Sequence, residues 1–200
     1  MKLIFALAVA YLLGSVPFAL VIGKVFYKTD VREHGSGNLG GGNTGRVLGK
    51  KAGLAVMTMD ILKVTCAMLM AKLLCGAESA AVCAAIAAAA GHCWPVFARF
   101  HGGKAVATLY GFCFGLWVLF GYGPFVFFLP LLVFLSVLYL TKIISLSSMI
   151  SALAVTVYFF FAASLPVRAA GVFFTVLIVV RHGKNIRRMA AGSENKISWM

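Results

Sequence analysis

The chain has 200 residues, 62% of them hydrophobic, and a mean hydropathy of +0.99, whereas a soluble domain is roughly 45–50% apolar. This composition excludes an ordinary soluble fold and indicates a helical membrane protein with several spans. The formal net charge of +13 would suggest nucleic-acid binding in a soluble protein, but here it indicates basic loops beside anionic lipid and an anionic substrate. We therefore expect no nucleic-acid partner.

Seven apolar runs, taken in chain order, are predicted to be transmembrane helices. The first run contains Gly14, Ser15 and Pro17, which predict a kink, and it is too long for the apolar region of a signal peptide. The third run is rich in alanine, which favours close helix packing. The predicted spans cover about residues 3–22, 52–74, 80–97, 105–120, 125–140, 146–163 and 169–180.

Basic residues gather in alternate connections, and this pattern predicts the orientation in the membrane. Most Lys and Arg residues follow the first span, surround residues 99–104, lie at 142, or belong to the C-terminal tail. Lys2 and Arg168 fall on the other side, whereas Lys63 and Lys72 lie within the second span. The positive-inside rule then predicts an N-terminus outside and a C-terminus in the cytoplasm. We expect one all-α, seven-helix domain over residues 1–200, with functional loops at about 24–51, 98–104, 141–146 and 181–200 on the cytoplasmic face.

The longest polar interruption, residues 34–46, is rich in glycine and ends at Arg46. Glycine lets the backbone approach a ligand closely, successive N–H groups can bind an anion, and a guanidinium suits phosphate. The stretch contains the dinucleotide pattern G-x-G-x-x-G, but apolar spans flank it where that pattern needs a strand. A P-loop is excluded because Arg46 and Val47 stand where its lysine and its Ser or Thr are required. We interpret the stretch as a phosphate-binding loop, and the alternative is a flexible linker.

Two further polar clusters follow along the chain. Gly102, Gly103 and Lys104 precede a predicted helix, and both the helix N-terminus and the lysine suit an anion. On this segment alone, a positive-inside anchor is an equally good interpretation. His182 and Asn185 share a face if the seventh helix continues, so they are candidates to orient or deprotonate a hydroxyl. No cluster has metal-ligand spacing, and we expect neither a metal nor a cofactor.

Three stretches together resemble one bacterial family. They are Ser36-Gly37-Asn38…Asn43…Arg46, Gly91-His92…Gly102-Gly103-Lys104, and His182…Asn185…Glu194. The family is the integral membrane acyltransferase that moves a fatty acyl group from acyl phosphate to glycerol 3-phosphate. The resemblance implies lysophosphatidate and phosphate as products and the bacterial inner membrane as the location. It also implies membrane lipid and a soluble enzyme that makes acyl phosphate as partners.

The same resemblance implies roles for individual residues. Catalytic roles fall to Ser36, Lys104, His182 and Asn185. Substrate-binding roles fall to Gly37, Asn38, Gly40, Asn43, Arg46, His92, Gly102, Gly103, Arg188 and Glu194. We interpret Ser36 as a hydrogen-bond donor rather than a nucleophile, because the sequence fixes no base beside it. The family usually has Ala-Thr where this chain has Gly41-Gly42, and we expect this departure to make the loop more flexible.

Asp60 and Lys63 are charged residues inside the second predicted span. Intramembrane charges are costly and are functional candidates by default. The simpler interpretation is an ion pair that packs inside the bundle and braces the glycine-rich loop.

Transport of an organic phosphate is the alternative function, since cationic loops suit it equally. Transporters are usually built from repeated halves, which this sequence lacks.

Overall fold

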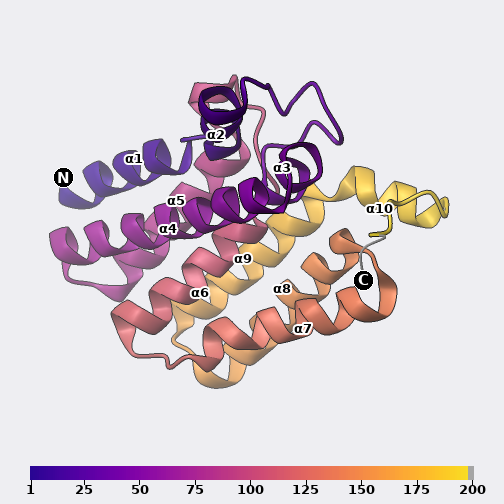
Figure 1. Cartoon of the computed structure of the whole chain (residues 1–200). Helices are drawn as coiled ribbons and strands as arrows, with labels where there is room; N and C mark the ends of the chain where they lie inside the picture. The colour runs from indigo at the N-terminus through magenta and orange to yellow at the C-terminus, as the bar shows by residue number, and fades with distance from the viewer. Residues whose placement is uncertain (198–200) are drawn as a thin grey trace. The chain divides into compact units, whose positions relative to one another are not determined.

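The computed structural model describes residues 1–197, and these fold as helices joined by loops and turns (Figure 1). The all-α prediction is therefore confirmed for this part of the chain. The chain divides into two compact units, the first Met1–Gly115 and the second beginning at Leu116. The boundary falls within helix α6 (Val106–Phe120), so this helix contributes residues to both units.

The first apolar run forms two helices, α1 (Lys2–Gly14) and α2 (Phe18–Tyr27). The break lies at Ser15–Pro17, because proline cannot donate the backbone hydrogen bond that would continue α1. The amide of Ser15 still donates to the Tyr11 carbonyl over 2.8 Å, so α1 is intact up to the break. The predicted kink is confirmed.

Helices α4 (Lys50–Cys75) and α5 (Glu78–Cys93) run antiparallel and pack with α1. At 1.5 Å per residue α4 is about 39 Å long, more than a hydrocarbon core requires. Gly76 ends α4 with a φ of 73°, a conformation that glycine adopts without strain. The predicted close packing of the alanine-rich helix is confirmed, since any Cβ at Gly91 would overlap the Tyr11 carbonyl of α1.

Part of the polar stretch between the first two spans is helical, which differs from the predicted loop over 24–51. Helix α2 continues to Tyr27, and α3 covers Gly41–Leu48. Small residues allow α3 to lie directly on α4: a Cβ on Gly41 would come within 2.7 Å of the Gly53 carbonyl oxygen. The glycines at 41 and 42 therefore lie in the first turn of a packed helix, and not in the loop that the sequence predicted.

The second unit contains α7 (Phe125–Thr141), α8 (Ile144–Ala162), α9 (Leu165–Arg181) and α10 (Gly183–Ala190). Helix α8 packs against both α7 and α9. The Tyr122 hydroxyl lies 3.2 Å from Ser164 Oγ and joins the turn before α7 to the turn before α9. Helices α9 and α10 meet at an angle of 59°.

The described helices are suited to a membrane in both length and surface. Four segments are long and apolar enough to cross it: Lys2–Tyr27, Lys50–Cys75, Glu78–Ala98 and Ile144–Ala162. The bent pair α9 and α10 counts as a fifth if it forms one span, and α6 and α7 are shorter apolar helices. Large apolar side chains such as Ile4, Leu73, Leu140 and Phe161 are at least 75% exposed, as expected where lipid is the solvent.

Candidate active site

The side chain of Asn43 orders the glycine-rich loop. Its Oδ1 accepts from the backbone amide of Ser36 over 2.7 Å and from Ser36 Oγ over 3.1 Å. Its Nδ2 donates to the carbonyls of Val31 over 2.9 Å and His34 over 3.2 Å. Asn43 is only 3% exposed, so its hydrogen-bonding groups serve the loop itself. The structure thus gives this residue an organising function beside the binding role that the sequence suggested.

Ser36 lies on the exposed rim of the loop, with its hydroxyl directed to Asn43. The neighbouring Gly35 has a φ of 62°, and a Cβ there would overlap Asn43 Oδ1. Glycine is therefore required at this position on two grounds, conformation and space. The carboxamide beside Ser36 is not a base, which agrees with the interpretation of Ser36 as a donor rather than a nucleophile.

Helix α3 presents its N-terminus at the end of the same loop. Gly40 is the N-cap residue, so the amides of the first turn carry the positive end of the helix dipole, which suits phosphate. Gly37, Asn38 and Gly40 are partly exposed around it, and Arg46 is exposed in the last turn of α3. These residues from the sequence prediction therefore lie within one short loop and one helix.

Buried apolar residues hold the glycine-rich loop and the segment after α5 together. Val31 and Leu39 from the loop and Ala98 from the short helix η1 (Val96–Ala98) belong to one core cluster. All three are less than 5% exposed. The glycine-rich loop and the segment that leads to Gly102 therefore meet within the first unit.

His92 packs directly against Gly102 and Gly103. The amide of Gly103 donates to the His92 carbonyl over 2.9 Å, and a Cβ on Gly103 would overlap the His92 ring at Nε2. Gly102 packs equally closely, against the carbonyls of His92 and Cys93. These glycines are required by packing, because no larger residue fits at either position. Their close packing positions the backbone of the next residue, the partly exposed Lys104.

The predicted ion pair between Asp60 and Lys63 is present, with 2.7 Å between Asp60 Oδ1 and Lys63 Nζ. His92 joins it: Nδ1 lies 3.1 Å from Lys63 Nζ and 3.6 Å from Asp60 Oδ1. Lys63 Nζ also donates to the Val16 carbonyl over 3.0 Å, at the break between α1 and α2. Sequence reasoning did not connect His92 to this pair, since i,i+3 spacing reveals partners only on the same helix.

In the second unit, Glu194 gathers three donors. Its Oε1 accepts from Asn185 Nδ2 over 2.6 Å and from Ser145 Oγ over 2.8 Å, and its Oε2 accepts from Arg188 Nε over 2.8 Å. Burial alone would raise the pKa of the Glu194 carboxyl, but the hydrogen bonds from Asn185, Arg188 and Ser145 outweigh it and hold that pKa below its usual value. The carboxylate is thus anionic near neutral pH and fastens the tail to α10 and α8.

Three of the four predicted C-terminal residues, Asn185, Arg188 and Glu194, meet in this cluster. His182 lies at the bend, where its Nδ1 is 2.8 Å from the Ile178 carbonyl oxygen. The condition for a shared helix face, a seventh helix that continues through His182, is not met, because α9 ends at Arg181 and α10 leaves at 59°. Both residues are buried, at 3% and 7% exposure.

The sequence analysis did not identify two residues that form contacts in these regions, Ser145 and Asp30. Ser145 contacts Glu194, and its position among serines at the start of an otherwise apolar helix was the available signal. Asp30 pairs with Arg32 over 2.6 Å and with Lys24 over 3.2 Å at the entrance of the glycine-rich loop. The hydrogen bond from Arg32 holds the pKa of Asp30 well below its usual range. An acidic residue amid basic ones was the signal there.

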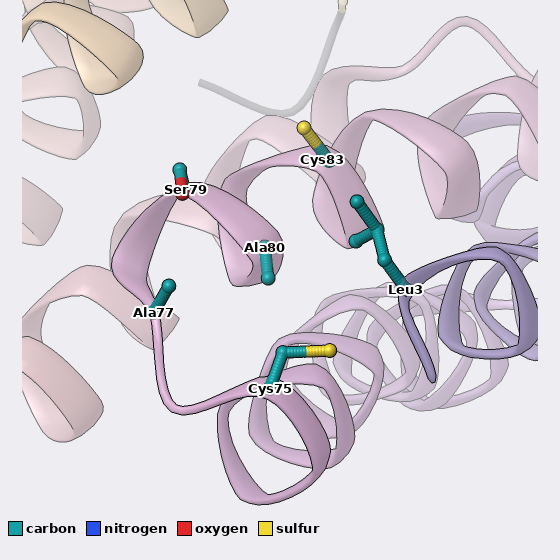
Figure 2. Close-up of a pocket in the computed structure, with 6 residues that line it drawn as sticks. All are labelled: Leu3, Cys75, Ala77, Ser79, Ala80 and Cys83. Carbon is teal, nitrogen blue, oxygen red and sulfur yellow. The ribbon is translucent and has the colours of Figure 1, made fainter. Parts of the chain in front are cut away.

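Two hollows in the first unit have mainly apolar walls. One of about 230 Å³ is lined by Leu3, Cys75, Ala77, Ser79, Ala80 and Cys83, around the turn between α4 and α5 (Figure 2). It contains none of the predicted site residues. A larger one of about 570 Å³ lies between α2 and α4, where Phe26, Tyr27 and Lys51 contribute to its lining. Apolar walls beside one lysine suit a lipid chain with an anionic head.

Comparison with known proteins gives one consistent result. The family model for glycerol-3-phosphate acyltransferase matches residues 4–192. A glycerol-3-phosphate acyltransferase of Geobacillus kaustophilus is 46% identical over 194 residues, covering 96% of this chain and 95% of the relative. One of Enterococcus faecalis is 43% identical over 209 residues, covering 100% and 94%.

Two solved structures are similar over almost the whole chain. The crystal structure of PlsY (YgiH), an integral membrane glycerol 3-phosphate acyltransferase, in its glycerol 3-phosphate form has a TM-score of 0.90 at 34% identity, covering 99% of this chain and 96% of the other. The lysophosphatidic acid form has a TM-score of 0.88 at 33% identity, with the same coverage.

Proposed function

The chain belongs to the glycerol-3-phosphate acyltransferase family, and from that premise we propose that it transfers a fatty acyl group from acyl phosphate to glycerol 3-phosphate. The products are lysophosphatidate and phosphate. The solved relatives with glycerol 3-phosphate and lysophosphatidic acid support the acceptor and the lipid product. We infer that a soluble enzyme supplies the acyl phosphate.

The observation that carries the proposal is that the glycine-rich loop, through Leu39, and the segment that leads to Gly102, through Ala98, share one buried cluster in the first unit. Both substrates carry phosphate, so two anionic groups must be held. The α3 N-terminus with Ser36 and Arg46 is assigned one phosphate. Gly102, Gly103 and Lys104 are assigned the other, since a lysine supplies a point charge where phosphate departs.

Acyl phosphate is a mixed anhydride with a good leaving group, so direct attack by the glycerol hydroxyl needs no covalent enzyme intermediate. The protein must align the hydroxyl, accept its proton and stabilise the oxyanion that forms. We assign alignment of the hydroxyl to His182 and Asn185, with the substrate phosphate or His182 as base. Arg188 and Glu194 hold Asn185 in place, as their contacts indicate.

We also propose the finer membrane arrangement. The described apolar helices overlap all seven predicted spans, α6 and α7 being the shorter ones. With seven spans in one membrane domain, the basic connections face the cytoplasm, the N-terminus lies outside and the C-terminus inside. The proposed location is the bacterial inner membrane with the reacting groups at its cytoplasmic face.

The decisive experiment compares acyl phosphate and acyl-CoA as donors, with purified protein in lipid and radiolabelled glycerol 3-phosphate. Acyl phosphate should give lysophosphatidate and acyl-CoA should not. Lys104→Ala should lower kcat at least about a hundredfold, the size of effect seen when one oxyanion-stabilising donor is removed. Lys72→Ala, a lysine at the far end of α4, is the control and should remain active. Equal use of acyl-CoA would refute the donor assignment, and normal turnover by Lys104→Ala would refute the role of Lys104.

A further inference from the structure

Three ionisable side chains meet in the interior of the first unit. Asp60 is 1% exposed, and Lys63 and His92 are each 6% exposed. Asp60 and Lys63 come from α4, whereas His92 comes from the last turn of α5. The proposed reaction uses neither Asp60 nor Lys63, yet buried charges inside a membrane protein are costly to keep.

Lys63 Nζ contacts the His92 ring at Nδ1. A lysine ammonium has three N–H donors and no lone pair. Its three polar neighbours are Asp60 Oδ1 at 2.7 Å, the Val16 carbonyl at 3.0 Å and His92 Nδ1 at 3.1 Å. A hydrogen bond from Lys63 Nζ to His92 Nδ1 requires a lone pair on Nδ1, and we infer from this contact a neutral ring that carries its proton on Nε2.

The other edge of that ring faces the Gly102–Lys104 segment. Nε2 abuts the Cα of Gly103 so closely that a Cβ there would overlap the ring. A backbone hydrogen bond also joins the two residues, since the Gly103 amide donates to the His92 carbonyl over 2.9 Å. Any rotation of the His92 ring would displace Gly103, and Lys104 is the next residue.

Lys63 also anchors the start of α2. The Val16 carbonyl accepts from Lys63 Nζ over 3.0 Å and also from the Phe18 amide over 3.2 Å, so Lys63 adds a second hydrogen bond at the break before α2. The ammonium lies 5.7 Å from the centre of the Phe18 ring, within range of a cation–π contact. One lysine thereby fixes both the α1–α2 break and, through His92, the segment that carries Lys104.

We propose that Asp60 and Lys63 are positioning residues for acyl transfer, which act through His92 to hold Lys104 in its reactive place. Asp60 orients the ammonium, the ammonium fixes the tautomer and rotation of the imidazole, and the imidazole fixes Gly103. His92 is then a positioning residue too, rather than a ligand of the substrate phosphate. This inference rests on the proposed role of Lys104.

The proposal predicts a specific kinetic signature. A small displacement of a charged group that stabilises developing charge lowers turnover more than it lowers ground-state binding. Disrupting the pair should therefore reduce kcat by about tenfold or more, while the KM for glycerol 3-phosphate changes by less than about threefold. A pair that only stabilises the fold would leave kcat unchanged in any variant that folds.

A variant with an apolar pair separates these two roles. Asp60→Leu/Lys63→Met has side chains of similar size, and such replacement of a buried ion pair is often neutral or stabilising. We expect it to unfold thermally near the wild-type temperature yet to show the loss of kcat. Asp60→Asn, which keeps the shape of the side chain, should show the same loss. Lys72→Met, which removes a charge from the same helix outside the network, should keep full turnover.

A spectroscopic measurement tests the arrangement in the intact wild-type protein. The ¹⁵N chemical shifts of histidine-labelled protein in lipid distinguish the two neutral tautomers and the imidazolium, and His92→Gln identifies the signal of His92. We expect the Nε2–H tautomer at neutral pH. An Nδ1–H ring or an imidazolium would overturn the proposal, and so would full kcat in a folded Asp60→Leu/Lys63→Met variant. If acyl phosphate proved to be the wrong donor, the ¹⁵N result would stand and the kinetics would be repeated with the donor that is used.

Discussion

Substitution of the Asn43 side chain is the sharpest test of which contacts order the glycine-rich loop. Replacing Asn43 with alanine removes four hydrogen bonds, to the amide and hydroxyl of Ser36 and to the carbonyls of Val31 and His34. Val31 is fully buried, so water cannot readily satisfy its carbonyl after the substitution. We therefore expect the loop to lose most of its order while the helices remain folded.

The size of the effect follows from these bonds. At about 1 kcal/mol net for each hydrogen bond, Asn43→Ala should cost the loop about 3–4 kcal/mol. Since about 1.4 kcal/mol corresponds to a factor of ten, amide protection over residues 31–40 should fall more than about a hundredfold. If an ordered loop binds phosphate, kcat/KM for glycerol 3-phosphate should fall to a similar degree.

Hydrogen–deuterium exchange with mass spectrometry measures the first quantity, and steady-state kinetics measure the second. Asn195→Ala is the matched control, because it makes the same substitution at an exposed position of the tail. The reasoning fails if Asn43→Ala retains wild-type protection over residues 31–40. It also fails, for the functional role of the loop, if protection is lost while kcat/KM is unchanged.

Three other predictions concern stability. The lowered pKa of Glu194 means that its contacts stabilise the tail at neutral pH and are lost as the pH falls through the folded-state pKa, below the usual value of about 4.3. The amide protection factors over residues 193–197, taken relative to the intrinsic exchange rate at each pH, should therefore fall on acidification, and Glu194→Gln should abolish that dependence. Gly42→Ala should raise the free energy of unfolding by about 0.5–1 kcal/mol, because alanine favours the helix and the space around Gly42 is open. Gly41→Ala should lower the unfolding temperature, because its Cβ would overlap α4. Lys63→Met alone should cost about 3–5 kcal/mol in denaturant unfolding, because it leaves the Asp60 carboxylate buried without its cation; an unchanged midpoint would contradict this.

Interactions between neighbours in the chain were predictable from the sequence. Pro17 disrupts a helix wherever its neighbours lie, so the break between α1 and α2 was predicted correctly. Residues three apart on one helix share a face, and Asp60 and Lys63 accordingly form their ion pair. Apolar runs must be helical in lipid, because their backbone groups have no other partners.

Errors arose where a residue's surroundings come from distant parts of the chain. Gly41 and Gly42 look like loop residues by propensity, but packing of α3 on Gly53 makes them the first turn of a helix. The run of residues through His182 looks continuous, yet the chain bends there. The contacts of Glu194 with Asn185, Arg188 and Ser145 then fasten the tail after the bend. Tertiary contacts overrode local preference in both places.

The sequence by itself determined the chemistry of this protein: its helical class, its basic loops and three polar clusters that resemble one acyltransferase family. Composition and local spacing carry that information, since the solvent and the helix period act on each segment separately. Only the tertiary structure decided which groups work together. His92 and Lys63 are far apart in sequence, and their contact exists because glycine and alanine let α1, α4 and α5 pack closely enough to bring them within 3.1 Å.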